Sequence, residues 1–142
     1  MPPDLPSLSL RKRLPSDLRV GNRFVEEIGA LLMEHGWPSR EIYAVQLAVE
    51  EGLANAMRHG NRLDRSKHVR VACHLNGERI QVEIADEGPG FKPNTVPDPT
   101  LDENLERPGG RGLLLMRSYM TRVEYNAAGN AVTMEKIRSR AS

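Results

Sequence analysis

The clearest local signal in this chain is the stretch Val69-Arg-Val-Ala-Cys-His-Leu75, Asn76-Gly77, Glu78-Arg-Ile-Gln-Val-Glu-Ile-Ala85. The segments before and after Asn76-Gly77 alternate apolar and polar residues, the first more weakly. Such alternation is typical of strands with one buried face. An Asn-Gly pair between two strands is typical of a two-residue turn. The stretch therefore predicts a β-hairpin, and with it an antiparallel sheet.

The segments on either side of this hairpin supply the rest of the predicted fold. Residues 8–14 alternate like a half-buried strand, and helices are expected between Asp17 and Gly36 and from Ser39, as N-cap, to about His59. Downstream we expect a long connection, a short helix and two strands, at residues 86–111, 112–120, 121–125 and 131–137. Helices segregated from hairpin-linked strands favour an α+β fold, a two-layer α/β sandwich with a mostly antiparallel sheet and helices on one face.

Length and composition limit the classes of function. The chain has 142 residues, which argues for one domain, expected over residues 8–137 with a flexible tail at 1–7 and a second tail at 138–142. Its 20 basic and 19 acidic residues give a net charge of +1, so no bulk charge favours nucleic acid or anionic lipid. A single cysteine, Cys73, excludes an intramolecular disulfide framework. No apolar run approaches the ~20 residues of a membrane span and no signal-like block is present, so we expect a cytoplasmic protein.

The second predicted helix carries a polar row away from its core stripe. On a helical projection, Glu51, Asn55 and His59 fall at about 180°, 220° and 260° from Ile42, which lies on the apolar side. Glu51 is about 40° from Asn55 on this projection, whereas Glu50 is about 140° away. The row is either solvated or bonded to backbone groups, or it points into a ligand cleft. In a cleft, the carboxylate could act as a general base and the amide could supply an oxygen ligand to a hard cation.

A strand end offers a second candidate contact, at Asp86-Glu-Gly-Pro-Gly-Phe91. The Asp86 carboxylate can accept a hydrogen bond from an exocyclic amine. Gly88 and Gly90 have no side chains, so their backbone can approach a flat ring closely. The same residues also fit an ordinary turn.

A third candidate is the stretch Glu106-Arg-Pro-Gly-Gly-Arg-Gly-Leu113, where glycines run directly into an apolar helix. Free N–H groups at a helix N-terminus favour an anion, and Arg107 or Arg111 could add positive charge. The alternative is a flexible loop followed by a helix start.

Together, in this order, the three segments resemble the N, G1 and G2 boxes of the GHKL ATPases. This superfamily includes the ATP-binding domains of gyrase, heat-shock chaperones, histidine kinases and mismatch-repair proteins. The matching residues are Glu51-Gly-Leu-Ala-Asn-Ala-Met-Arg-His-Gly60, Asp86-Glu-Gly-Pro-Gly-Phe91 and Gly110-Arg-Gly-Leu113. The Asn-Ala-x-x-His-Gly wording and the Arg-Gly-Leu helix are most similar to bacterial anti-sigma-factor serine/threonine-protein kinases. Covering about residues 15–137, the resemblance implies the GHKL (Bergerat) fold, a left-handed ATP-binding α/β sandwich with a lid over the phosphates.

The resemblance also implies a role for each candidate residue. Asn55 would bind the Mg²⁺ that bridges the phosphates, Glu51 would act as the base for a serine hydroxyl, and Asp86 would bind the adenine amino group. The other residues implied to contact ATP are His59, Gly88, Gly90, Arg107, Gly110, Arg111 and Gly112.

The implied function is that of an ATP-dependent serine/threonine-protein kinase acting as an anti-sigma factor. Its substrate would be a serine or threonine on a small anti-anti-sigma (STAS-type) protein, its second partner a sigma factor, and its assembly a homodimer. The alternative is a non-catalytic switch that binds nucleotide and sequesters a regulator without phosphoryl transfer. A histidine-kinase module is disfavoured, because the sequence shows no preceding helix pair with a phospho-accepting histidine.

Two departures accompany this resemblance. Many relatives carry a threonine near adenine where this chain reads Gly129-Asn130-Ala131, which leaves that contact open. The expected lid is rich in proline: the chain has 12 glycines and 10 prolines, and ten of them lie between Glu87 and Gly112. Connections this long in small domains are usually functional or disordered. We therefore expect the lid to be poorly ordered without nucleotide and protected with it.

Overall fold

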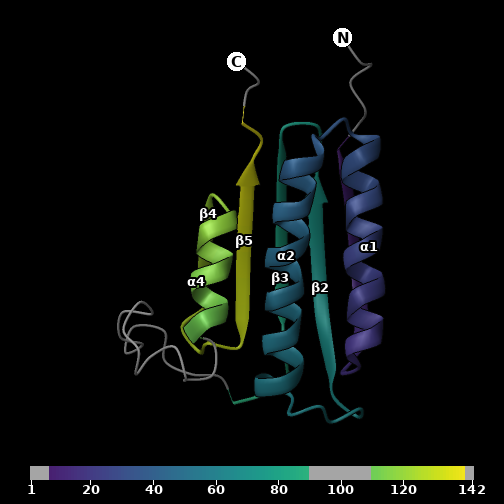
Figure 1. Ribbon diagram of the computed structural model, residues 1–142. Coiled ribbons are helices and arrows are strands. Elements are labelled where there is room, and N and C mark those ends of the chain that lie inside the picture. The colour runs from purple at the N-terminus through teal and green to yellow at the C-terminus, as the bar shows by residue number, and fades with distance from the viewer. Residues whose placement is uncertain (1–6, 90–109, 140–142) are drawn as a thin grey trace.

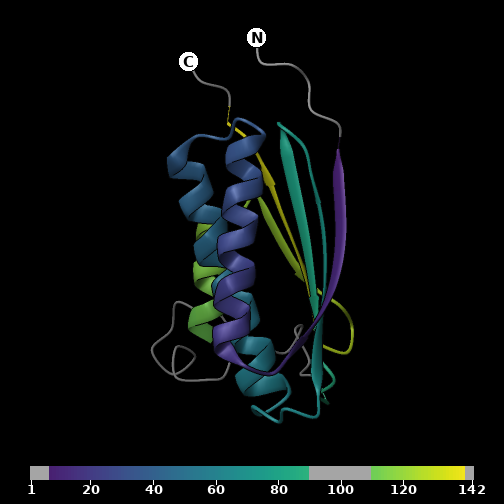
Figure 2. The same cartoon turned by 90° about the vertical axis from the view of Figure 1, so that its right-hand side faces the viewer.

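A computed structural model describes residues 7–89 and 110–139 of the chain (Figure 1). The elements in chain order are β1 (Leu8–Pro15), α1 (Leu18–Glu34), α2 (Ser39–Asn55), the π-helical turn η1 (Ala56–Gly60), β2 (His68–Leu75), β3 (Arg79–Ala85), α4 (Gly110–Tyr119), β4 (Arg122–Tyr125) and β5 (Ala131–Ile137). The strands form one sheet in the order β1-β2-β3-β5-β4, and every neighbouring pair is antiparallel. The three α-helices cover one face of this sheet, as the side view in Figure 2 shows. The predicted α+β two-layer sandwich is confirmed.

The core lies between the two layers, because the apolar positions of the helices and of the strands face each other. Helix α2 packs between α1 and α4 (Figure 1). At Gly52 this helix comes very close to the sheet: a Cβ there would lie 2.9 Å from both Ile84 Cδ1 and Met134 Cε. The missing side chain at Gly52 thus lets the middle helix lie directly on the side chains of β3 and β5. The largest fully buried side chains include Ile28, Leu32, Met57, Leu75, Ile80, Ile84, Met116 and Met134, and Cys73 is buried among the core residues as predicted.

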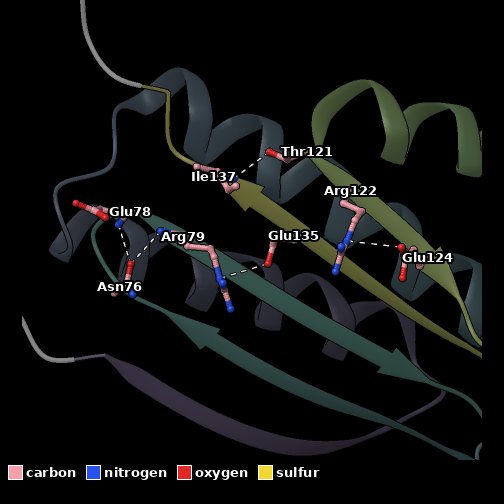
Figure 3. A network of polar contacts seen from close by, with 8 residues as sticks. All are labelled: Asn76, Glu78, Arg79, Thr121, Arg122, Glu124, Glu135 and Ile137. Atoms are coloured by element: carbon pink, nitrogen blue, oxygen red, sulfur yellow. Dashed lines mark hydrogen bonds and ion pairs between the residues drawn. The ribbon is translucent and has the colours of Figure 1, made fainter.

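The predicted hairpin is present, but its turn lies one residue later than expected. The N–H of Asn76 donates to the carbonyl of Arg79 at 3.0 Å, so Gly77 and Glu78 occupy the centre of the turn. Asn76 Oδ1 accepts from the N–H groups of Glu78 at 2.8 Å and Arg79 at 2.9 Å (Figure 3). The asparagine side chain therefore caps the turn from its first position, and this bonding outweighs the preference of Asn-Gly for the two central positions.

Ion pairs lie on the sheet beside this turn. Arg79 Nε lies 3.3 Å from Glu135 Oε2 across β3 and β5, and Arg122 Nε lies 3.7 Å from Glu124 Oε1 within β4 (Figure 3). Both arginine side chains are largely exposed, so these pairs contribute little to stability.

The second predicted helix differs from expectation at both ends. Pro38, not Ser39, occupies the N-cap position, and no side chain caps the helix. The φ of −70° at Pro38 suits this position, and its carbonyl accepts the N–H of Ile42 at 3.0 Å. At the other end the α-helix stops at Asn55 rather than continuing to His59, and η1 follows.

Hydrogen bonding extends past Ile137, where we expected the domain to end. Arg138 N–H donates to the carbonyl of Glu78 at 2.8 Å. Ser139 donates both its N–H, at 2.8 Å, and its hydroxyl, at 2.7 Å, to Glu41 Oε1. Within residues 7–89 and 110–139, no helix has the length and hydropathy needed to cross a bilayer.

Candidate functional site

The polar row predicted on the second helix is divided by a change of helix type. Glu51 and Asn55 lie one turn apart at the end of α2, and both are half-buried. From Ala56 the backbone is π-helical, since the N–H of Asn61 donates to the Ala56 carbonyl at 2.8 Å, five residues back. The wider turn moves His59 off the α-helical row and leaves it exposed. Single π-turns of this kind are frequent at functional sites.

The start of α4 contacts the end of α2 directly. A Cβ added at Gly112 would lie 2.5 Å from Asn55 Nδ2 and 2.7 Å from Glu51 Oε1. With these two side chains in their present positions, there is no room for a Cβ at this residue. The helix begins at Gly110, two residues earlier than predicted, so the contact falls in its first turn. The first turn of α4 therefore lies, at Gly112, beside a carboxylate and an amide that are about 60 residues away in sequence.

The end of β3 approaches η1 closely at two further glycines, Gly60 and Gly88. A Cβ at Gly60 would lie 2.3 Å from the carboxylate carbon of Asp86, and a Cβ at Gly88 would lie 2.1 Å from the Gly60 carbonyl oxygen. Asp86 is half-buried, and one of its oxygens, Oδ1, accepts the N–H of Gly88 at 2.7 Å. Burial raises the pKa of Asp86, while the hydrogen bond from Gly88 and the charge of Lys67 lower it by less.

A cavity of about 370 Å³ opens between these elements. This volume falls within the range of small-molecule and cofactor sites. Apolar side chains such as Ile84 and Val132 line it together with the polar groups Asn55 and Asp86. The complete lining is Gly52, Asn55, Ala56, Arg58, His59, Gly60, Arg62, Ile84, Asp86, Pro89, Tyr125, Gly129, Asn130, Ala131 and Val132. An apolar slot with a few convergent polar groups suits a flat heterocycle that carries hydrogen-bonding edges.

Tyr125 is a lining residue that the sequence reasoning missed. Burial raises the pKa of its hydroxyl to about 12; the neighbouring Asn55 side chain acts in the opposite direction, and the charges of Asp86 and Glu51 raise it further. The phenol therefore stays protonated near neutral pH and faces the polar groups of the site. Strand alternation contained the signal, because Tyr125 lies two residues after buried Val123 and so shares its inward face.

The side chain of Asn55 fits a ligand contact. Its Nδ2 is buried and has no hydrogen-bond partner among the residues that the structure describes. Leaving a buried amide unbonded costs free energy, which a ligand could recover. Carboxylate and amide oxygens are also the donors that Mg²⁺ prefers, and Mg²⁺ commonly takes only one or two protein ligands and completes its shell with phosphate and water. The described part of the chain contains no cluster of three or more His, Cys, Asp or Glu residues that could hold a metal ion.

The described residues thus bring most of the predicted site together. Asn55, His59 and Asp86 line the cavity, and Gly88 adjoins it through Gly60. Glu51 does not line the cavity but adjoins Asn55 and Gly112. Gly110 and Arg111 lie in the first turn of α4, and the position of the Arg111 side chain is not described. The predictions for Gly90, Arg107 and most of the lid fall outside the described residues.

Comparisons with known proteins identify the family of this chain. A family model described as the histidine kinase-like ATPase domain matches residues 14–136. Serine-protein kinase RsbW of Bacillus subtilis is 33% identical over 111 residues, which is 71% of this chain and 68% of the relative. An anti-sigma F factor of Oceanobacillus iheyensis is 30% identical over 68% of this chain and 69% of the relative. Serine/threonine-protein kinase BtrW of Bordetella bronchiseptica is 28% identical over 63% of this chain and 64% of the relative.

A solved structure shows the same fold. The crystal structure of the RsbU and RsbW domains of Rv1364c from Mycobacterium tuberculosis superposes with a TM-score of 0.65 at 19% identity. The superposition covers 96% of this chain and 34% of that longer chain. The family model and the relatives agree, and the chain belongs to the histidine kinase-like ATPase domain family of the GHKL superfamily, in the branch of the anti-sigma-factor serine kinases.

Proposed function

We propose that this chain is an ATP-dependent serine/threonine-protein kinase that acts as an anti-sigma factor and phosphorylates a small anti-anti-sigma (STAS-type) protein. The observation that carries the proposal is the contact of Gly112 with both Glu51 and Asn55. It joins a helix N-terminus, a carboxylate and an amide at the edge of a cavity of nucleotide size. Relatives named as serine-protein kinases and as an anti-sigma F factor support the proposal at about 30% identity.

In this proposal the cavity holds the nucleoside of ATP. Asp86 accepts a hydrogen bond from the adenine amino group. The close contact between Gly60 and Gly88 lies next to Asp86. The phosphates extend toward the first turn of α4, where the N–H groups at Gly110 and Gly112 and the helix dipole favour negative charge. His59 lines the cavity and adds a further polar contact. Gly90, Arg107 and Arg111 stay proposed contacts from the lid side.

Asn55 and Glu51 have separate roles in phosphoryl transfer. Asn55 supplies an amide oxygen to Mg²⁺, which when bound neutralises charge on the phosphates. Glu51 accepts the proton of the incoming serine hydroxyl while that oxygen attacks the terminal phosphorus, and ADP leaves. Its position one turn from Asn55 keeps the base next to the phosphate end of the site. Phosphoryl transfer depends mainly on such positioning and charge stabilisation, which these two side chains and the helix terminus would supply.

The decisive experiment compares two adjacent acids. The chain, Glu51→Gln and Glu50→Gln are each incubated with labelled Mg·ATP and a candidate anti-anti-sigma protein, and phosphoserine on the partner is measured. Glu50 is exposed and lies away from Asn55 on α2, so its variant is a matched control. We expect Glu51→Gln to bind ATP normally and to lose transfer by about two orders of magnitude or more, a typical effect of removing a general base.

The outcome also separates the alternative function. If the wild-type chain binds ATP and captures a regulator in a nucleotide-dependent way but transfers no phosphate, it is a binding switch. A fully active Glu51→Gln variant would remove Glu51 from the mechanism. A pull-down with and without ATP identifies the sigma factor or other regulator held by the chain.

A further inference from the structure

Asn61 is a fully buried amide that nothing in the proposed ATP site explains. Its exposed fraction is 0%, and it follows η1 directly. It does not line the cavity, so a bound nucleotide cannot touch it. Buried polar side chains with complete bonding usually hold a specific arrangement of the backbone.

The hydrogen bonds of Asn61 connect three separate parts of the chain. Nδ2 donates to Ser16 Oγ at 2.9 Å and to the His68 carbonyl at 3.1 Å, and Oδ1 accepts the N–H of Glu87 at 2.8 Å. Ser16 is itself 2% exposed and donates its hydroxyl to the Lys67 carbonyl at 2.8 Å. The network therefore anchors the end of β3 to the end of β1 and the start of β2.

Of these hydrogen bonds, the one between Asn61 and Glu87 acts next to the cavity residue Asp86. The Glu87 N–H belongs to the peptide group that follows Asp86. The peptide group that precedes Asp86 is held on the other side, since its N–H donates to the Asn130 carbonyl at 2.9 Å. The Glu87 carboxylate also accepts the N–H of His68. Both peptides flanking Asp86 are thus fixed, and with them the direction in which its carboxylate enters the cavity.

We propose that Asn61 is a positioning residue for base recognition: its Oδ1 orients Asp86 so that the cavity prefers a 6-amino purine to a 6-oxo purine. The inference rests on the proposed binding of ATP in this cavity. A 6-amino group donates to the carboxylate, whereas a 6-oxo group places an oxygen against it. The preference of the cavity for the amino form therefore depends on where the carboxylate lies, and displacement of Asp86 should abolish that preference.

The test measures affinity for Mg·ATP and Mg·ITP by titration calorimetry, because the two nucleotides share the ribose and triphosphate. The base preference is the dissociation constant for ITP divided by that for ATP. In Asn61→Ala we expect this ratio to fall roughly tenfold or more toward one, because a charge-assisted hydrogen bond contributes about that much to affinity. Asn61→Asp keeps an oxygen for the Glu87 N–H but loses both Nδ2 donors and sets an oxygen against the His68 carbonyl, so it should lower the melting temperature more than it lowers the preference. Ser16→Ala removes a hydroxyl from the network but leaves the Asn61–Glu87 bond, so it should lower the melting temperature without changing the ratio.

The outcomes are separable. If Asn61→Ala weakens ATP and ITP equally, Asn61 is only structural and the inference fails. If the wild-type chain binds ATP without preferring it to ITP, the assignment of Asp86 to adenine fails, and a chain that binds neither contradicts the proposed function itself. Should Asn61→Ala not fold, Asn61→Leu, which keeps the side-chain volume without the polar groups, is measured in its place, and an unchanged ratio there overturns the inference.

Discussion

Replacing Gly112 by alanine tests the central contact of the site. The new Cβ would lie 2.5 Å from Asn55 Nδ2, 2.7 Å from Glu51 Oε1 and 3.0 Å from Glu51 Cγ. Side-chain carbons do not approach such atoms this closely, so the two side chains must rotate or α4 must withdraw. Either response alters the relation between the helix N-terminus, the carboxylate and the amide on which the proposed phosphate site depends.

The size of the effect follows from two opposing contributions. Alanine favours a helix over glycine by about 1 kcal/mol, whereas forcing a methyl group into a packed contact costs about 1–3 kcal/mol. The free energy of unfolding should therefore fall by no more than about 2 kcal/mol, and the variant should fold. The strain is concentrated on Asn55 and Glu51. If binding of Mg·ATP requires these two side chains to return to their present positions, it must overcome a strain of about 1–3 kcal/mol. The affinity then falls roughly 5- to 150-fold.

The assay is calorimetric titration with Mg·ATP, paired with urea unfolding. Gly21→Ala serves as the matched control, because it also adds a methyl group to a helix. Its Cβ would lie 3.3 Å from Cε of the flexible Met57 side chain and 3.7 Å from Leu53 Cδ1, away from Asn55 and Glu51, and should leave nucleotide affinity unchanged. The reasoning is refuted if folded Gly112→Ala binds Mg·ATP as tightly as the wild-type chain does.

Four further outcomes are expected. Asn55→Ala should abolish the Mg²⁺ dependence of ATP binding measured by titration at varied Mg²⁺, and tight Mg²⁺-dependent binding would contradict its role. Because burial raises the pKa of Asp86, ATP affinity should decline on acidification at a higher pH than for an ordinary carboxyl group, and Asp86→Asn should not show that decline. The ionised Asp86 is disfavoured in the fold, so the free energy of unfolding should fall as pH rises from the ordinary aspartate value through the raised one, and Asp86→Asn should remove this slope in pH-dependent urea melts. Burial raises the pKa of Cys73 to about 12, so its thiol should react with a disulfide reagent only on unfolding, and rapid reaction of the folded chain would contradict its burial.

Local patterns predicted most of the fold, since strands and helices are defined by short-range periodicity. The hairpin, both long helices and the last two strands follow from alternation or helical spacing, and their boundaries are within a few residues of expectation. The departures from expectation lie at turns and helix ends. Asn76 moved the turn by one residue, and the chain changes to a π-turn after Asn55. Neither event changes hydrophobic periodicity, so periodicity could not reveal it.

The candidate site was predictable in its motifs and not in its geometry. Glu51, Asn55 and Asp86 stand out in the sequence as polar residues in unusual surroundings. Tyr125 and Asn61 do not, because an inward tyrosine at a strand end and an asparagine after a helix are common. Their significance comes from neighbours distant in the chain: Tyr125 faces Asn55, and Asn61 bonds to Ser16, His68 and Glu87.

The sequence by itself determined the class of fold, the order of the elements and the residue types available for chemistry, because these depend on local pattern and composition. Only the tertiary structure decided which of them meet. The three glycines Gly60, Gly88 and Gly112 look alike in sequence, yet each permits a different close approach, to Asp86, to the Gly60 carbonyl and to Glu51 with Asn55. The physical reason is that a contact between segments far apart in the chain depends on how whole layers pack, and no short stretch of residues encodes that packing.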